Sequence, residues 1–438
     1  MAVDQTVTRK TPRFFYGWVI VALSFFTLFA AIGTRWSFGV FYVAVLSTFD
    51  WSRADTAGAF SLAMITHGLF APLSGYLIDR FGPRWLFPLG GLFLALGLTV
   101  ASRIQTIWQF YLCFGMGLGL GINTLSFSPN MSRIPLWFVS KRGLASGIVL
   151  SGIGIGSLIM VPLVEFAIVH LGWRNALLLL AAFILCLLVP VNALFQRRTP
   201  EDVGQYADGE PPRFSGSGHS GSGGGRTLSP SQKTQTQWTL KMAFRTGPFW
   251  WLNFIGLCQG FLFNMLLVHQ VVYFVDMGYS SVFAASLLGM VGLFSSAGGI
   301  LSGKLSDRMG REVTYTLGSL LAFCGILMLI LVKGAGFTWM LYGFVLLYGL
   351  GQGSLLPLTA STTGDLFPGR SLGKIFSMQS IWFGIGAAAG PYLGGVLYDL
   401  RGSYFVPFLL LLVAIAVGNG AIWFAAPRRR ISGGLSPS

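Results

Sequence analysis

Two stretches of the chain repeat one pattern: Gly75-Tyr-Leu-Ile-Asp79-Arg80-Phe-Gly82-Pro-Arg84 and Gly303-Lys-Leu-Ser-Asp307-Arg308-Met-Gly310-Arg311. Both contain Gly-x-x-x-Asp-Arg-x-Gly, and the second copy follows the first by 228 residues, counted from Asp79 to Asp307. Each copy comes after the second long apolar run of its half of the chain. The repeat therefore indicates a protein built from two similar halves.

Outside the two copies, charged residues divide the chain into twelve uncharged, apolar intervals. Each interval has about 18 residues or more, the length that an α-helix needs to cross roughly 30 Å of hydrocarbon. Strands of a membrane barrel would instead be about ten residues long with alternating polarity. The pattern predicts an all-α membrane protein with twelve transmembrane helices in two pseudo-symmetric six-helix bundles.

The composition supports this fold class, because 53% of the residues are hydrophobic and only 10% are charged. A soluble protein of this size would need about a quarter of its residues charged. The longest polar interval, with a Gly/Ser-rich middle, separates the sixth helix from the seventh. The predicted parts are an N-terminal arm (1–13), a six-helix bundle (14–196), a flexible linker (197–245), a second bundle (246–427) and a tail (428–438), and a short turn is expected at Leu240–Phe244.

The basic residues predict which way the helices cross the membrane. If the N-terminus is cytoplasmic, 23 Lys and Arg residues fall in cytoplasmic segments and five in outer loops, while Arg35 lies within the membrane. Cytoplasmic loops are enriched in basic residues, so both termini are predicted to be cytoplasmic, in a multi-pass protein of the plasma (inner) membrane. The net charge of +15 is then explained by contact with lipid headgroups, and no nucleic-acid partner is expected.

The doubled motif resembles the signature loop of the major facilitator superfamily, over about residues 15 to 427. The resemblance implies halves that rock about a central site, with the two loops forming a charge clamp that holds one gating state closed. Glycine allows close helix contact, and the aspartate can accept from the amides of a neighbouring helix N-terminus. The residues predicted to control gating are Gly75, Asp79, Arg80, Arg84, Lys141, Arg142, Gly303, Asp307, Arg308 and Arg311.

A second stretch narrows the resemblance to one family. Trp137-Phe138-Val-Ser140-Lys141-Arg142-Gly-Leu144-Ala145-Ser-Gly147 is similar to the signature of the monocarboxylate transporters, except that Ser140 replaces a base. The related oxalate–formate antiporter group stays open. The monocarboxylate family carries an Asp and an Arg in helix 8, credited with proton coupling and carboxylate binding, and this chain has neither in its eighth interval.

Arg35 is the candidate for binding an anion. It lies about 21 residues into the first helix, towards the predicted outer side, and its planar fork of donors suits a carboxylate. A snorkelling arginine at the outer interface is the alternative. The resemblance supports the first reading, since monocarboxylate transporters have a lysine in this part of helix 1.

Helices 1, 4, 7 and 10 line the cavity in the superfamily, which adds candidates on the last three. The predicted substrate-binding residues are Arg35, Asn123, Asn264, His269, Tyr348 and Gln352, with Ser126, Asn130 and Gln270 as further polar candidates. His269 is the best candidate for carrying a proton. His67 is expected to be a packed histidine, Glu165 to lie at the outer interface, and Asp365 to serve the gate or cap a helix.

Together these features predict a secondary transporter of a small organic anion, such as a lactate-like or pyruvate-like monocarboxylate, with protons as a possible coupling ion. The chain has no ATP-binding, zinc-protease or nucleophile-elbow motif, so no enzyme activity, cofactor or metal is expected. The alternatives are an exporter of drugs or other metabolites, and a membrane sensor that binds without transporting. A monomer surrounded by membrane lipids is expected.

Overall fold

The computed structural model describes residues 14–209, 238–332, 334–368 and 371–425. The described residues contain twelve helical spans long and apolar enough to cross a membrane. The predicted all-α fold with six spans on each side of the linker is therefore confirmed. The predicted N-terminal arm and tail lie outside the described residues.

The first half contains spans one to six. Spans two, three and five are single helices, span one consists of two helices, and spans four and six are interrupted by π-helical stretches. The elements are α1 (Gly17–Trp36) and α2 (Phe38–Thr48) in span one; α3 (Arg53–Phe81); α4 (Pro83–Ala101); α5 (Ile107–Phe110), η1 (Tyr111–Leu118), α6 (Gly119–Leu125), α7 (Phe127–Met131) and α8 (Ile134–Trp137) in span four; α9 (Arg142–Leu171); and α10 (Trp173–Phe183), η2 (Ile184–Leu188) and α11 (Val189–Phe195) in span six.

The second half contains spans seven to twelve, each a single helix. Two short 3₁₀ helices follow the first half and one short α-helix precedes the second. The elements are η3 (Pro200–Val203) and η4 (Ala207–Gly209); α12 (Leu240–Phe244), where the short turn is predicted; and α13 (Gly247–Asp276), α14 (Ser281–Met309), α15 (Arg311–Leu331), η6 (Ala335–Phe337), α16 (Thr338–Leu366), α17 (Leu372–Arg401) and α18 (Phe405–Ala425).

The repeated motif has the same local structure in both halves. Gly82 ends α3 at φ +77°, and Gly310 ends α14 at φ +92°. Only glycine adopts such angles without strain, so the last glycine of each copy allows the chain to reverse into the next helix. The same two helices begin alike, because the Ser52 and Ser280 side chains accept hydrogen bonds from the first-turn amides.

Span one is longer than the first uncharged interval, which stops at Thr34. The helix continues through Arg35, is interrupted at Ser37 and ends at Thr48. A single arginine does not end a helix, because its backbone still makes the regular hydrogen bonds. Arg35 consequently lies near the middle of a 32-residue span, rather than towards one end.

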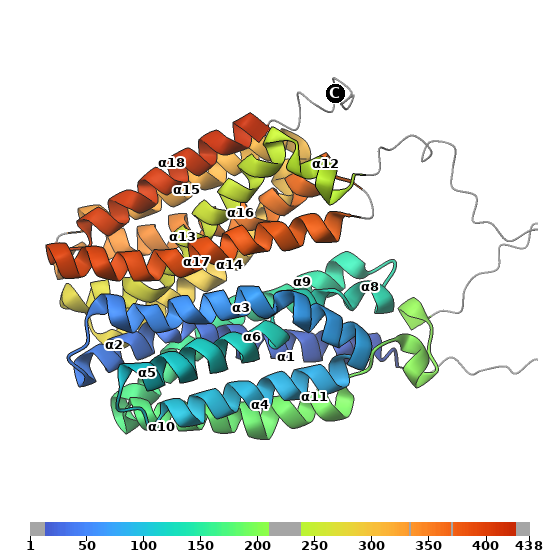
Figure 1. The fold of residues 1–438 in the computed structure, drawn as a ribbon, viewed down its shortest axis with the longest axis horizontal. Helices are drawn as coiled ribbons and strands as arrows, with labels where there is room; N and C mark the ends of the chain where they lie inside the picture. Colours follow the sequence, from blue (N-terminus) through green and yellow to red (C-terminus); the bar gives the residue numbers. More distant parts are fainter. Residues whose placement is uncertain (1–13, 210–237, 333, 369–370, 426–438) are drawn as a thin grey trace, which may run out of the picture.

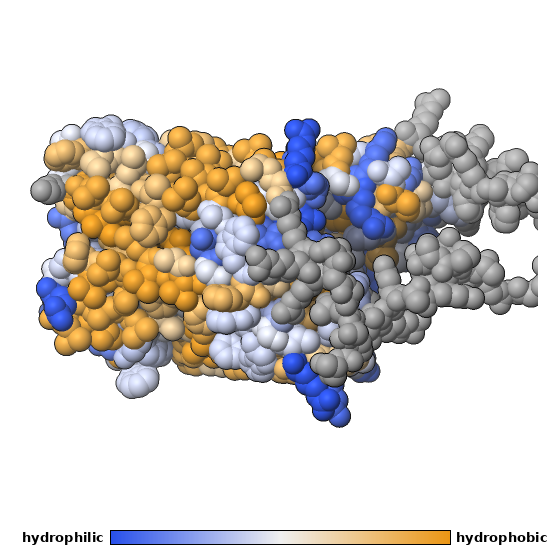
Figure 2. All heavy atoms as spheres, turned by 90° about the horizontal axis from the view of Figure 1, so that it is seen from above, coloured by the Kyte–Doolittle hydropathy of each residue, from blue (hydrophilic) through white to orange (hydrophobic). Residues whose placement is uncertain are grey.

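The two halves lie side by side and meet along two pairs of long helices. Helix α3 packs along α17, and α9 packs along α14 (Figure 1). We call the end where α11 finishes and α12 begins the linker end, and the opposite end the distal end; the linker end is the predicted cytoplasmic side. Hydrophobic side chains cover much of the outer surface, and hydrophilic ones gather towards the linker end (Figure 2).

Candidate functional site

Arg35 projects from α1 into the space between the two halves. One terminal nitrogen, Nη2, donates to Asn264 Oδ1 on α13 at 2.7 Å and lies 3.2 Å from the Met64 sulfur on α3. The guanidinium also lies 6.0 Å from the centre of the Phe60 ring and 5.8 Å from that of Phe263. The arginine thus contacts both halves of the molecule.

The surroundings of Arg35 leave its charge unpaired. Among the described residues no Asp or Glu forms an ion pair with it, and its Nε is buried without a hydrogen-bond partner. The side chain as a whole is half-buried. A cation at membrane depth costs at least about 2.5–3.5 kcal/mol, and a neutral amide offsets only part of this cost. The site can therefore stabilise an additional negative charge.

Of the other predicted substrate-binding residues, only Asn264 contacts Arg35. Asn123 is buried and donates to the His67 carbonyl oxygen at 2.6 Å. Tyr348 is buried against Phe344 inside the second half, where its hydroxyl has no partner. Gln352 accepts from Ser295 Oγ at 2.9 Å, between α14 and α16. Tyr348 and Gln352 thus pack within the second half, because their helix turns them towards its neighbours.

His269 lies in a closed contact at the distal end, and its exposed fraction is 0%. Its Nε2 is 2.8 Å from the Pro391 carbonyl oxygen, and its Nδ1 is 3.0 Å from the Tyr404 hydroxyl. A carbonyl oxygen only accepts, so Nε2 carries the proton and Nδ1 accepts from Tyr404. Tertiary contacts therefore occupy both ring nitrogens of His269.

The distal ends of the halves are held together by charged groups. The Arg53 guanidinium at the start of α3 pairs with Asp276 at 2.8 Å, and donates to the Tyr404 hydroxyl. The Asp399 carboxylate on α17 accepts from the backbone N–H groups of Arg53 and Ala54 at 3.1 and 2.9 Å. An acceptor from one half thus binds the helix N-terminus of the other.

A related contact joins α9 to α14. Glu165, expected at the interface, is only 3% exposed, and its carboxylate lies beside the side chain of Ser281, the first residue of α14. Since α9 and α17 hold equivalent places in the two halves, the distal end has two carboxylate–helix contacts related by the repeat. We call these two contacts, that of Asp399 with the start of α3 and that of Glu165 with the start of α14, the distal clasps.

Glycines along the four helices between the halves show which end is closed. A Cβ added at Gly289 on α14 would lie 2.9 Å from the Ser157 carbonyl oxygen, and one at Gly395 on α17 would lie 2.5 Å from Ala54 Cα. Nearer the linker end, a Cβ would meet open space at every one of these positions: Gly68 and Gly75 on α3, Gly143 and Gly147 on α9, Gly303 on α14, and Gly373 and Gly384 on α17. The halves are packed together distally and apart towards the linker end.

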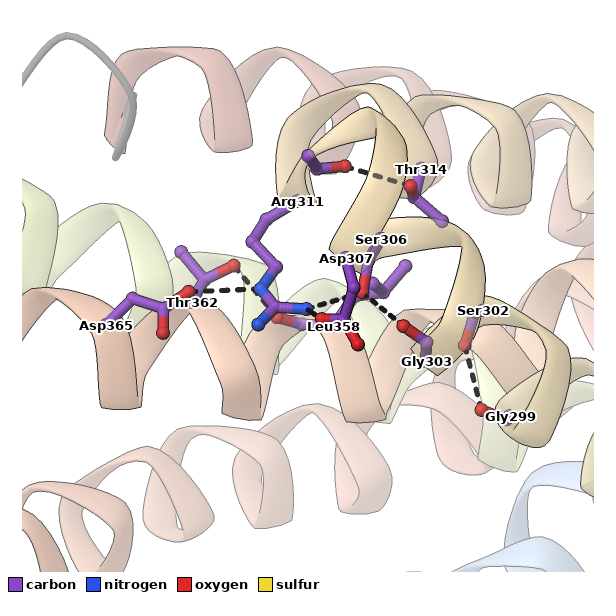
Figure 3. Close-up of polar contacts among 11 residues, drawn as sticks. Gly299, Ser302, Gly303, Ser306, Asp307, Arg311, Thr314, Leu358, Thr362 and Asp365 are labelled. Atoms are coloured by element: carbon purple, nitrogen blue, oxygen red, sulfur yellow. Dashed lines mark hydrogen bonds and ion pairs between the residues drawn. The ribbon is translucent and has the colours of Figure 1, made fainter. Parts of the chain in front are cut away.

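The expected close helix contact at Gly75 and Gly303 is thus absent from this conformation. The charged residues of the second motif copy instead join three helices of one half: Arg311 on α15 bonds Asp307 on α14 and Asp365 on α16, both at 3.0 Å (Figure 3). Asp365 therefore takes part in the motif's charge cluster, while Arg308 is exposed.

The first copy is arranged differently. Arg80 donates to the Tyr76 hydroxyl and Arg84 to the Ala193 carbonyl oxygen, whereas the Asp79 side chain lies outside the described residues. Lys141 precedes the first turn of α9, and Arg142 makes one long hydrogen bond, 3.4 Å, to Phe138. The motif side chains described here thus contact their own half.

The described start of the linker is folded against the first half. The Asp208 carboxylate accepts from the backbone N–H groups of Val139 and Ser140 at 3.1 and 2.8 Å. Burial alone would raise the pKa of this carboxyl, but the N–H groups of Ser140 and Val139 bring the pKa below its usual value. Residues 210–237 of the predicted flexible linker lie outside the described residues.

Arg133, counted among the cytoplasmic basic residues, is buried inside the first half at 3% exposure. It donates to Gln196 Oε1, to Ser24 Oγ at 3.1 Å and to Asn130 Oδ1 at 3.2 Å, and it lies over the Phe87 ring. Charge counting cannot distinguish such a residue from a solvated one. The sequence analysis also did not identify the residues of the distal contacts. Arg53, Asp276 and Asp399 all lie close to the ends of apolar intervals at the predicted outer side.

Comparisons with known proteins agree with this architecture. A bacterial homologue of the human lysosomal transporter Spinster, solved in an inward-facing and unoccupied conformation, matches with a TM-score of 0.69 at 17% identity, over 97% of this chain and 99% of that one. At this identity the match shows the fold alone.

Relatives by sequence are more specific. Monocarboxylate transporter 13 of Bos taurus is 27% identical over 93% of this chain and 88% of its own length. Monocarboxylate transporter 12 of Homo sapiens is 26% identical over 98% of this chain and 84% of its own. An uncharacterised MFS-type transporter of Bacillus subtilis (strain 168), YcxA, is 24% identical over 93% of each chain.

These relatives are transporters and not enzymes, in agreement with the sequence motifs. The family model described as Major Facilitator Superfamily matches residues 24–347 and 333–436, which covers most of both halves. With its two six-span halves and its repeated loop, this multi-pass membrane protein belongs to the major facilitator superfamily.

Proposed function

We propose that this chain is a secondary active transporter that carries a small organic anion, a monocarboxylate such as lactate or pyruvate, by alternating access. The observation that carries the proposal is Arg35, a cation near the middle of its span that touches both halves and pairs with no acid among the described residues. Its planar fork matches a carboxylate, and a single cation suits a singly charged substrate. The names of the relatives, monocarboxylate transporters 12 and 13, support the same substrate class.

Alternating access would use the two ends of the molecule as gates. The distal contacts around Arg53 and Asp399 act as the outer gate, and the doubled motif acts on the linker end. The 23-to-5 distribution of basic residues supports a cytoplasmic linker end in the plasma membrane. In this orientation the conformation described here is the inward-open one, in which Arg35 can receive or release an anion on the cytoplasmic side.

Counterflow of labelled pyruvate and lactate in proteoliposomes tests the proposal. Arg35→Gln should abolish saturable exchange, because the amide cannot balance the substrate's charge, and Arg35→Lys should keep part of it at lower affinity. Arg103→Gln is the control, since Arg103 is an exposed basic residue in a distal loop. Exchange by Arg35→Gln with wild-type kinetics would reject Arg35 as the anion site.

A second candidate is an exporter of amphipathic drugs or a carrier of other metabolites. It is favoured by the aromatic rings around Arg35. The ring centres of Trp36 and Phe263 are 5.5 Å apart, and the Phe60 ring lies against the guanidinium. Exchange of such compounds without exchange of any monocarboxylate would select this candidate. Saturable binding of an anion without counterflow would instead indicate a sensor.

A further inference from the structure

We propose that His67 binds the coupling proton of this transporter, and that its protonation is linked to carboxylate binding at Arg35, so that one anion and one proton move together. The inference rests on the proposed function, because it takes Arg35 as the anion site. It assigns a role to a histidine that the sequence suggested was only packed, and it replaces His269 as the proton carrier.

The position of His67 on α3 brings it to the anion site. Phe60, Met64 and His67 are spaced four and three residues apart, so they lie in one stripe along the helix. The first two contact Arg35: the Phe60 ring centre is 6.0 Å from the guanidinium carbon, and the Met64 sulfur is 3.2 Å from Nη2. His67 continues the stripe by one turn towards the linker end, where the halves are apart.

No hydrogen bond within the described residues occupies the ring nitrogens of His67. The residue is half-buried, and neither nitrogen is among the fully buried polar atoms that lack a partner. The neighbouring Gly68 faces open space. Meanwhile the His67 carbonyl oxygen accepts from Asn123 Nδ2, which ties this turn of α3 to α6. Asn123 thus holds the backbone of this turn, and the His67 residue remains partly exposed.

His269 has the opposite properties. With Nε2 donating to Pro391 and Nδ1 accepting from Tyr404, a second proton on the ring would have to point at the Tyr404 oxygen. That oxygen already accepts from the Arg53 guanidinium at 2.8 Å. Protonation of His269 would therefore break a hydrogen bond and place a second cation in the closed distal contact.

Electrostatics link the proton on His67 to the anion at Arg35. Arg35 is the charged group whose field acts on the His67 ring; Asn123 and Met64, the nearby polar and sulfur groups, are neutral. The acid Asp399 of the packed helix α17 lies at the distal end, against Arg53. Burial opposes a charge on the His67 ring most strongly and the charge of Arg35 adds to it, so an anion bound to Arg35 would offset the second of these two effects.

Linkage makes the effect reciprocal: anion binding favours the proton, and the proton raises anion affinity by the same factor. Arg35 stays with the protein, so a cargo of one monocarboxylate and one proton carries no net charge. The Asp and Arg that the eighth uncharged interval lacks then need no replacement within that interval.

Isothermal titration of purified wild-type protein with pyruvate, in buffers of different ionisation enthalpy, counts the protons taken up on binding. We expect a net uptake approaching about one proton per anion, with affinity rising up to about tenfold per unit fall in pH. Binding of pyruvate without proton uptake would overturn the proposal, whatever the behaviour of any variant.

Transport by His67→Gln in proteoliposomes gives the second measurement. The variant should lose both accumulation driven by an inward pH gradient and the pH dependence of pyruvate affinity, because the glutamine amide takes up no proton. His170→Gln is the matched control, because His170 is an exposed histidine at the distal end of α9. His269→Gln should retain proton uptake.

The outcomes separate the two proposals. Exchange that survives in Arg35→Gln rejects the proposed function. If Arg35→Gln abolishes exchange but His67→Gln still accumulates pyruvate with wild-type pH dependence, only the role of His67 is rejected. His67→Asn serves in the same assays if His67→Gln does not fold.

Discussion

Arg35 and Arg133 are both arginines inside the bundle without an acidic partner among the described residues, but their surroundings differ. Arg35 is half-buried between the halves and has a free Nε. Arg133 is enclosed within one half, where Gln196, Ser24 and Asn130 accept its hydrogen bonds. The first arrangement leaves a buried donor of the guanidinium without an acceptor, whereas no buried nitrogen of Arg133 lacks a partner within the described residues. We therefore assign binding to Arg35 and a structural role to Arg133.

Arg133→Lys should lower stability by about 1–3 kcal/mol, because an ammonium group cannot reproduce the guanidinium fork and leaves buried acceptors unpaired. Thermal unfolding of the detergent-solubilised protein measures the change. Arg142→Lys is the control, since Arg142 is exposed and makes only one 3.4 Å hydrogen bond, so its effect should stay within about 0.5 kcal/mol. Equal stability of the Arg133 and Arg142 variants would exclude this structural role.

At the scale of helices, the distal clasps use the partial positive charge of a helix N-terminus. Asp399 accepts from the backbone N–H groups of Arg53 and Ala54 at the start of α3, and Glu165 lies beside the first residue of α14. Carboxylates at such positions stabilise by about 0.3–1 kcal/mol, and by more when partly buried. Two equivalent clasps would thus favour the closed distal end without fixing it permanently.

Asp399→Asn should shift the equilibrium towards the distally open conformation by several-fold, because the neutral amide has one acceptor oxygen and no charge for the helix N-terminus. Distances between spin labels at the distal ends of the two halves report the populations. Asp50→Asn is the control, as Asp50 is an exposed acid in the loop before α3. An unchanged distance distribution in Asp399→Asn would show that the clasp has no part in gating.

At the scale of the whole molecule, the four helices between the halves have a packed distal part and an open linker part. The glycine positions show this difference, since a Cβ added at Gly289 would meet Ser157 and Leu158, whereas one added at Gly147 would meet open space. Rocking the halves about Arg35 would exchange the two situations. The central site would then face one side of the membrane at a time, as alternating access requires.

Gly289→Val should depopulate the distally closed conformation, because the new side chain would overlap the backbone of α9. Gly147→Val should leave that conformation intact. Both substitutions replace a mid-helix glycine with the same residue, so the change in helix propensity is matched and the difference reports packing. Label distances and pyruvate counterflow measure the effects, and similar populations in the two variants would contradict the packing shown here.

The twelve spans, the division into halves and the presence of Arg35 in the membrane could be read from the chain, because hydrophobic length and charge spacing are properties of the sequence itself. Some helix ends also depend on the local sequence alone: Gly82 and Gly310 end their helices because glycine adopts positive φ without strain. The first apolar interval was shorter than the span, because it was ended at the charge of Arg35, whereas the helix continues through this residue.

What only the tertiary structure decided is the direction in which each side chain points. A membrane helix is apolar on the faces towards lipid and towards protein alike, so its composition does not reveal which face meets the other half. The sequence favoured His269 over His67 as the proton carrier, yet packing encloses His269 beside Tyr404 and leaves His67 partly exposed on the helix stripe whose Phe60 and Met64 contact Arg35. The partners of Arg53 and Arg133 likewise lie far away in the chain, and only the assembled bundle brings them together.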